Sequence, residues 1–238
     1  MAKILDIKRR NSSFFGSSSK NKVLPHEYYV GGMEGEVLTY TAVDVSPEML
    51  SVARNRLRES IPGLKQIMAK TRTEPYPSLS SPEEVIPVVA ALDNRVQLLL
   101  GDAEYDLPKT QERYDTIIQS FGLCSVKDPK SLLVKMAKRV TPNTGRILLL
   151  EHGRGYFNLL NTWLDKYAPS HFAKYGCWWN RDIEGLVRQA SEELGGRLEV
   201  VKVEKPWWHG GTTVVLELRV NDEGRKEQDK KEGEKKKE

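Results

Sequence analysis

The 238-residue sequence predicts an α/β fold, a doubly wound and mostly parallel sheet that ends in an antiparallel hairpin. The first observation behind this prediction is that apolar strand-like runs and helical patterns alternate along the chain. Strand–helix–strand units need parallel strands with helices on both faces. The second observation is that the last two strand-like runs are joined by only His209–Gly211, so they pair antiparallel.

The predicted strands are short apolar runs that stop at a polar residue or a glycine. The apolar residues of these runs are mainly Val, Ile and Leu, which in short runs bounded by turn residues favours strands over helices. In chain order the runs are "LTYTAVDV", "RVQLLLGD", "YDTIIQSFG", "GRILLLEHG", "RLEVVKVEKPWW" and "TTVVLELRV".

Two of the predicted helices begin with both a cap residue and a proline in the first turn. Ser46 can cap the helix of "SPEMLSVARNRLRES", where Pro47 suits the first turn and Glu48 faces the positive end of the helix dipole. The helix of "DPKSLLVKMAKRV" is capped by Asp128 and has Pro129 in its first turn.

Three further segments have a helical pattern. "NRDIEGLVRQASEELGG" is expected to be capped by Asn180 and stopped by Gly195 and Gly196. The segment from Tyr156 to Phe172 is helical in pattern, and Pro82–Leu92 is a short helix candidate.

The charge of the chain indicates three parts. The formal net charge is +4, but the excess lies in residues 1–22, which are basic, serine-rich and poor in acids. That composition is typical of a transit peptide, although a frayed tail would look the same. Residues 23–220 form the predicted domain and are nearly neutral, which disfavours a generic nucleic-acid-binding module. Residues 221–238 have no large apolar side chain, so we expect a disordered tail.

Cysteine spacing gives no sign of a metal or a disulfide framework. Cys124 and Cys177 are the only cysteines, they lie in unrelated sequence contexts, and neither belongs to a CxxC motif. Nor do His171, Cys177 and His209 match a metal-binding pattern. We therefore expect no metal, a reducing compartment and Cys124 as a small packing residue. No run of about 18 apolar residues predicts a membrane span.

Polar side chains follow four of the predicted strands. The first strand ends in Asp44, the second in Asp102, the third runs into Ser120, and the fourth ends in Glu151 and His152. Because ligands of open α/β sheets bind beyond the carboxyl ends of the strands, we expect these groups to line one crevice. Each acid alone could be a loop or cap residue, but four such strand ends together favour a nucleoside site.

The nucleoside cofactor can be narrowed from the residues. An acid in the position of Asp44 can accept both ribose hydroxyls, and Asp102 could bind an adenine amino group. NAD would need G-x-G-x-x-G after the first strand to hold its pyrophosphate, and that pattern is missing. S-adenosylmethionine carries no phosphate, so it fits the sequence better.

Four motifs in order resemble the class I S-adenosylmethionine-dependent methyltransferases. They are "TAVDVSPEMLSVAR", "LLLGDAEYDLP", "YDTIIQSFGLCSVKDPKSLL" and "ILLLEHG". The chain looks similar to the branch of quinone C-methyltransferases and alkyl-thiol methyltransferases. "LCSV" and "EHGRG", followed by "YGCWWNRDI", resemble the mitochondrial inner-membrane Oms-type methyltransferase proteins. The resemblance covers about Val37 to Val220 and implies a Rossmann-like fold.

The resemblance also implies roles for individual residues. Asp44 would hold the ribose hydroxyls, Met49 would pack on adenine, Asp102 and Ala103 would meet the adenine edge, and Ser120 would lie near the methionine end. The residues expected to bind S-adenosylmethionine are Asp44, Val45, Met49, Asp102, Ala103 and Ser120.

The sequence departs from this family at two places. The family's first strand and glycine-rich loop are degenerate or missing. Ala2–Lys8 looks like that strand, but one glycine follows it, and Tyr29–Gly35 has glycines without a preceding strand. Asp44 and Asp102 also lie farther apart than the corresponding family residues. We interpret the surplus, residues 61–91, as a surface insertion.

Methyl transfer needs alignment of acceptor and methyl group, and needs a base only if the acceptor must lose a proton. His152 is the candidate base, with a structural hydrogen-bonded histidine as the alternative. We expect a small apolar, thiol or lipid-like acceptor, peripheral membrane association and a mitochondrial location. The alternatives are a non-catalytic assembly protein that has lost cofactor binding and, less favoured, an RNA methyltransferase. The sequence does not fix the oligomeric state.

Overall fold

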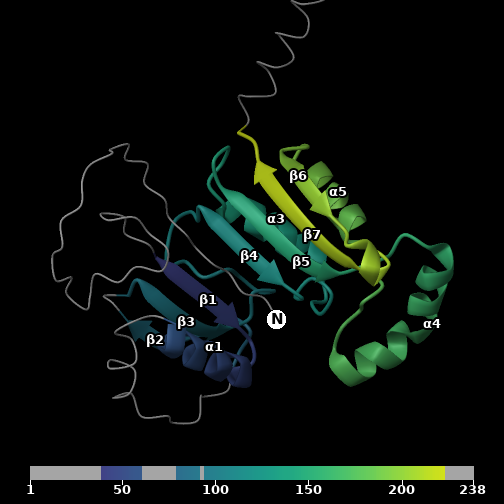
Figure 1. Ribbon diagram of the computed structural model, residues 1–238. Coiled ribbons are helices and arrows are strands. Elements are labelled where there is room, and N and C mark those ends of the chain that lie inside the picture. The colour runs from purple at the N-terminus through teal and green to yellow at the C-terminus, as the bar shows by residue number, and fades with distance from the viewer. Residues whose placement is uncertain (1–38, 61–78, 92–93, 223–238) are drawn as a thin grey trace, which may run out of the picture. The chain divides into compact units, whose positions relative to one another are not determined.

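The computed structural model describes residues 39–60, 79–91 and 94–222 (Figure 1). These residues fall into two compact units, one ending at Thr110 and the other beginning at Gln111. The predicted first strand Ala2–Lys8, the basic segment 1–22 and nearly all of the predicted tail lie outside the described residues.

The unit up to Thr110 is built on a three-stranded sheet with the order β1-β3-β2. Strand β1 (Tyr40–Asp44) pairs parallel with the central strand β3 (Val96–Gly101), whereas β2 (Val85–Ala91) pairs antiparallel with β3. Helix α1 (Pro47–Ser60) contacts β1 and β3. A crossover helix between parallel strands is the arrangement predicted from this part of the sequence.

The prediction of a helix at Pro82–Leu92 was wrong, because this segment contains strand β2. Its β-branched residues favour an extended backbone, and a proline inside a helix would remove a hydrogen bond. Pro87 is tolerated here because β2 lies at the edge of the sheet and the register shifts between Pro87 and Val89. The latter part of residues 61–91 therefore belongs to the sheet.

Helix α1 is fixed by its N-terminal cap and its apolar face. Ser46 Oγ accepts a hydrogen bond from Met49 N–H at 3.2 Å, which confirms the predicted cap. Leu50 is buried against the strands, with Ala53 and Leu57 packed beside it. The buried cluster under the helix comprises Ala42, Leu50, Val89, Ala91, Val96, Leu98 and Leu100.

The unit from Gln111 onward contains a four-stranded sheet with the order β4-β5-β7-β6. Strands β4 (Thr116–Ser120) and β5 (Arg146–His152) are parallel. Strand β7 (Thr213–Val220) is antiparallel to both β5 and β6 (Leu198–Glu204). The antiparallel pair at the end of the sheet confirms the predicted hairpin.

Among the described residues of this unit, the α-helices are α3 (Pro129–Arg139), α4 (Asn158–Tyr175) and α5 (Ile183–Glu193) (Figure 1). Helices α3 and α5 pack against each other, and α5 also contacts β6. Helix α4 follows β5 in the chain. The helix is followed by the C-cap residue Gly176, whose positive φ of 66° allows the chain to turn there.

The caps of α3 and α5 test two predictions. Asp128 Oδ1 accepts Ser131 N–H at 2.9 Å, as predicted for α3. For α5 the predicted cap Asn180 was wrong, because Asp182 Oδ1 accepts Gly185 N–H at 2.9 Å. Both residue types cap well, so composition alone could not choose between them.

The connection of the hairpin is longer than the three residues predicted. It runs from the end of β6 at Glu204 to the start of β7 at Thr213 and includes a 3-10 turn, Trp207–His209. Trp207 and Trp208 in this turn are 77% and 68% exposed, so they are not core residues.

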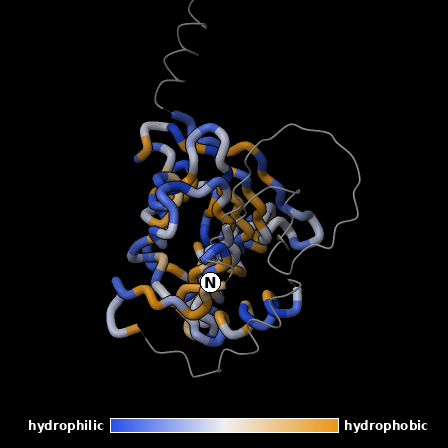
Figure 2. Tube along the Cα trace, turned by 90° about the vertical axis from the view of Figure 1, so that its left-hand side faces the viewer, coloured by the Kyte–Doolittle hydropathy of each residue, from blue (hydrophilic) through white to orange (hydrophobic). Residues whose placement is uncertain are grey.

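Apolar and polar segments alternate along the described trace (Figure 2). Among the described residues, no helix combines the length and the apolar character that a membrane crossing requires. The α/β class is confirmed in both units, each of which combines a parallel strand pair with at least one antiparallel neighbour.

Candidate functional site

Asp44 and Asp102 lie at the same edge of the three-stranded sheet. Asp44 is the last residue of β1 and stands opposite Leu100 of β3, and Asp102 follows two residues beyond Leu100. Because β1 and β3 are parallel, both acids are at the carboxyl ends of their strands. The structure thus brings together the two acids that the sequence assigned to the nucleoside.

Each acid also shapes the turn that follows its strand. Asp44 Oδ1 accepts the N–H of Ser46 at 2.9 Å, and Asp102 Oδ1 accepts the N–H of Glu104 at 2.8 Å. A short polar side chain that binds a backbone N–H two residues later stabilises this kind of turn. Asp44 is buried, with 5% of its surface exposed. A buried acid at a strand end is costly unless it has polar partners, which makes it a candidate binding group.

The neighbouring predicted residues differ in accessibility. Val45 is 58% exposed, Met49 is partly buried in the first turn of α1, and Ala103 is 6% exposed. Val45 and Met49 are therefore accessible to a ligand at this edge. Because Ala103 is almost fully buried, a ligand could contact little more than its backbone atoms.

Ser120 and His152 lie at the corresponding edge of the four-stranded sheet. Ser120 ends β4 and stands opposite Leu150 of the parallel strand β5, so His152 follows two residues beyond it. The ring of His152 packs against Phe121, with 4.5 Å between the ring centroids. These two residues and the two acids belong to different compact units.

Glu151 holds the loop after β4 in place, a role that the sequence did not predict. The side chain is fully buried, and its Oε1 accepts the N–H groups of Gly122 and Leu123 at 3.1 Å each. Burial raises the pKa of Glu151 to about 7, although the Leu123 N–H acts in the opposite direction.

Cys124, His152 and Cys177 converge, contrary to the expectation from their unrelated sequence contexts. The sulfurs of both cysteines and one ring nitrogen of His152 all lie within 4.8 Å of one another. Cys177 Sγ is 3.6 Å from His152 Nδ1. A hydrogen bond from the Cys177 thiol lowers the pKa of Cys124, and the same bond raises the pKa of Cys177. The pair therefore favours a thiolate at Cys124.

Chain topology explains why the sequence missed this cluster. Cys124 and His152 follow the ends of neighbouring parallel strands, so their proximity could have been inferred. Cys177 arrives only after the 18 residues of α4 and the turn at Gly176, and the direction of that helix is not encoded in any local motif.

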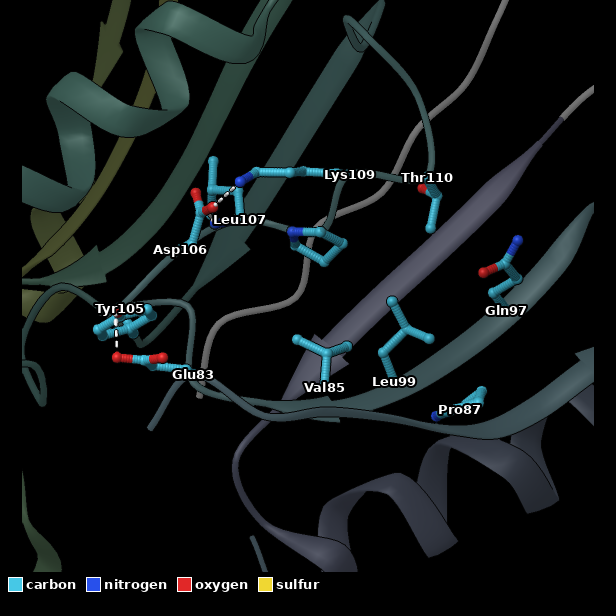
Figure 3. A pocket seen from close by; sticks show the side chains of 11 residues that line it. Glu83, Val85, Pro87, Gln97, Leu99, Tyr105, Asp106, Leu107, Lys109 and Thr110 are labelled. Atoms are coloured by element: carbon cyan, nitrogen blue, oxygen red, sulfur yellow. Dashed lines mark hydrogen bonds and ion pairs between the residues drawn. The ribbon is translucent and has the colours of Figure 1, made fainter. Parts of the chain in front are cut away.

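The described residues also line a pocket of about 520 Å³ on the unit that ends at Thr110 (Figure 3). Figure 3 shows the side chains of Val85 and Leu99 pointing into it from the strands, with the segment from Tyr105 to Thr110 opposite them. Tyr105 Oη donates to Glu83 Oε1 at 2.6 Å across one end. None of the predicted cofactor residues is among those lining this pocket.

The described residues have a Rossmann-like α/β fold with two acids at neighbouring strand ends. In sequence the chain is 33% identical over 175 residues to "Methyltransferase OMS1, mitochondrial" of Saccharomyces cerevisiae. The match covers 73% of this chain and 31% of that protein, so the chain spans about a third of the length of this curated relative. The resemblance to Oms-type methyltransferase proteins is thereby confirmed. No family model matches the chain.

Two solved structures illustrate more distant likenesses. The YcgJ protein of Bacillus subtilis has a TM-score of 0.48 and 13% identity, with 77% of this chain and 82% of that chain covered. The [4+2]-cyclase SpnF also has a TM-score of 0.48, with 12% identity and coverage of 79% and 67%. Likeness at this level says nothing of function.

Proposed function

We propose that the protein binds S-adenosylmethionine at the edge formed by Asp44 and Asp102 and transfers a methyl group to a small acceptor. The observation that carries this proposal is the pair of acids at the carboxyl ends of adjacent parallel strands. The curated relative, which is named a methyltransferase, supports the reaction class. The cofactor, when bound, supplies a methyl group activated on a sulfonium sulfur.

The residues at this edge fit the adenosine part of that cofactor. The Asp44 carboxylate can accept hydrogen bonds from vicinal hydroxyls, and such charge-assisted bonds are stronger than neutral ones. The first turn of α1 brings the Met49 side chain next to the same edge, where a soft apolar group can pack on an aromatic base. Asp102 would accept a hydrogen bond from the exocyclic amino group of adenine, a group that uracil lacks.

By the family resemblance alone, Ser120 would lie near the methionine end of the cofactor and His152 would be the base for an acceptor that must lose a proton. Each of these residues is the last of its strand, Ser120 in β4 and His152 in β5.

The acceptor we propose is small and apolar, a thiol or lipid-like molecule. Exposed aromatic side chains around α4 and the hairpin turn support an apolar acceptor or contact with a membrane surface, because either would bury their apolar rings. They are Tyr156, Phe157, Trp163, Tyr167, Phe172, Tyr175, Trp207 and Trp208. The name of the curated relative supports a mitochondrial location.

Calorimetric titration of the full chain with S-adenosylmethionine tests the proposal. We expect saturable binding that weakens at least about tenfold in Asp44→Ala, because a charge-assisted hydrogen bond contributes about 1.5–3 kcal/mol. Asp44→Asn keeps an acceptor for the Ser46 N–H but loses the charge, so it should weaken binding without disturbing the turn.

Asp106→Ala is the matched control, because Asp106 lines the pocket on the sheet face and not the proposed edge. It should bind as the unaltered chain does. No binding at millimolar cofactor would overturn the proposal and favour a non-catalytic assembly role. Binding that Asp44→Ala leaves unchanged would instead place the cofactor elsewhere.

A further inference from the structure

We infer that Cys124, His152 and Cys177 form a binding site for a Zn²⁺ ion, an assignment that replaces the role of base proposed above for His152 and leaves the proposed cofactor edge unchanged. The site lies wholly within the unit from Gln111 onward. Zn²⁺ prefers ligand sets of cysteine sulfurs and imidazole nitrogens such as this one. Mg²⁺ and Ca²⁺, in contrast, need oxygen ligands.

The distances between the ligand atoms suit a tetrahedral ion. Zn–S bonds of about 2.3 Å and Zn–N bonds of about 2.0 Å place a sulfur and a nitrogen ligand about 3.5 Å apart, and two sulfurs about 3.8 Å apart. Cys177 Sγ and His152 Nδ1 are separated by 3.6 Å. The largest separation in the cluster is no more than 4.8 Å, so the ligands need to move by about 1 Å or less to bind the ion.

Hydrogen bonds between backbone segments hold the two cysteines together without the help of their side chains. Trp178 N–H donates to Cys124 O at 2.7 Å, which joins the segment after α4 to the loop after β4. Arg181 binds that loop on both sides of the cysteine, because it donates to Leu123 O at 2.6 Å and to Val126 O at 2.8 Å.

Further contacts orient the remaining ligand groups. His171 Nδ1 lies 2.9 Å from Cys177 O, which fixes the backbone of the second cysteine. The Phe121 ring packs on the His152 ring and restricts its rotation. Partners that orient metal ligands in this way raise metal affinity. A pair of cysteines that served only for packing would not need an imidazole nitrogen beside it.

The surroundings place the site at the border between core and surface. Cys124 and Cys177 are 1% and 8% exposed, and His152 is partly exposed. Three protein ligands leave one tetrahedral position for water or another small ligand, which is the pattern of zinc sites with exchangeable positions. With its Nδ1 on the metal, His152 would act as a ligand and not as a general base.

Cobalt substitution of the full chain provides the test. After treatment with a chelator and a thiol reductant, one Co²⁺ per chain should give the visible absorption of tetrahedral cobalt together with thiolate-to-cobalt charge transfer. Zn²⁺ should displace it. Cys124→Ser, Cys177→Ser and His152→Gln should each lower the affinity for Zn²⁺ at least about 100-fold in competition with a coloured chelator.

His209→Gln is the control, because His209 binds Thr213 Oγ1 in the hairpin and should not affect the metal. If the ligand variants fail to fold, alkylation of the unaltered chain still tests the site. Bound Zn²⁺ should protect both cysteine thiols from the alkylating reagent. Absence of charge transfer and of protection would overturn the inference. So would a Cys124–Cys177 disulfide that forms in air while the reduced chain binds no metal, because the cluster would then be a redox pair.

Discussion

Leu98→Ala is expected to lower the free energy of unfolding by about 2–5 kcal/mol, the range for a leucine removed from a packed core. Leu98 has no exposed surface, and it lies on β3 between Ala42 of β1 and Val89 of β2. A cavity at this point loses contacts to both neighbouring strands and to the face under α1.

The rate of hydrogen exchange of the β3 backbone amides measures the loss of stability in Leu98→Ala at the strand itself. All five tryptophans lie after Thr110, so their fluorescence is a poor monitor of this sheet. Val52→Ala in α1 is the matched control, because Val52 is 50% exposed and alanine favours a helix. Equal exchange rates in Leu98→Ala and the control would show that β3 is not the centre of a packed core.

Glu151→Gln is expected to stabilise the chelator-treated protein at pH 8 by about 3 kcal/mol. Burial raises the folded-state pKa of Glu151 to about 7, whereas an unfolded glutamate titrates near 4.5. Between these two values the unfolded chain releases a proton that the folded chain keeps. The stability of the unaltered protein therefore falls as pH rises from about 4.5 to about 7 and then levels off.

The glutamine keeps the structural role of the residue, since its carbonyl oxygen can still accept the Gly122 and Leu123 N–H groups. It removes the charge and puts an amide NH2 group at the position of the buried Oε2. Urea unfolding followed by tryptophan fluorescence should give equal stabilities near pH 4.5 and a difference that grows up to pH 8. The exposed Glu192→Gln in α5 should change stability by less than about 0.5 kcal/mol at either pH. A pH-independent difference at Glu151 would contradict the buried-charge account.

The sequence predicted most elements because their signals are local. Short apolar runs predicted six of the strands, and Ser46 and Asp128 capped their helices as expected. Pro82–Leu92 failed because a short apolar run has no clear period, and only the pairing of β2 with β3 settles its state. The choice of Asp182 over Asn180 likewise depends on where the chain turns after α4.

One candidate site could be predicted from the sequence and the other could not. Asp44 and Asp102 could be placed together because parallel strands present their carboxyl ends at one edge. The approach of Cys177 to Cys124 and His152 could not, because it depends on the direction of a long helix and on bonds from Trp178 and Arg181. Tertiary contacts between distant segments leave little trace in a single sequence.

Titration of ¹⁵N-labelled protein with S-adenosylhomocysteine, followed by amide chemical shifts, tests the central claim most directly. The proposed site predicts the largest shifts in Asp44–Met49 and at Asp102, Ala103 and Glu104. Shifts confined to Tyr105–Thr110 and the strands facing it would place the ligand in the pocket of Figure 3. That result, or no shift at millimolar ligand, would contradict the assignment of the strand-end acids to the cofactor.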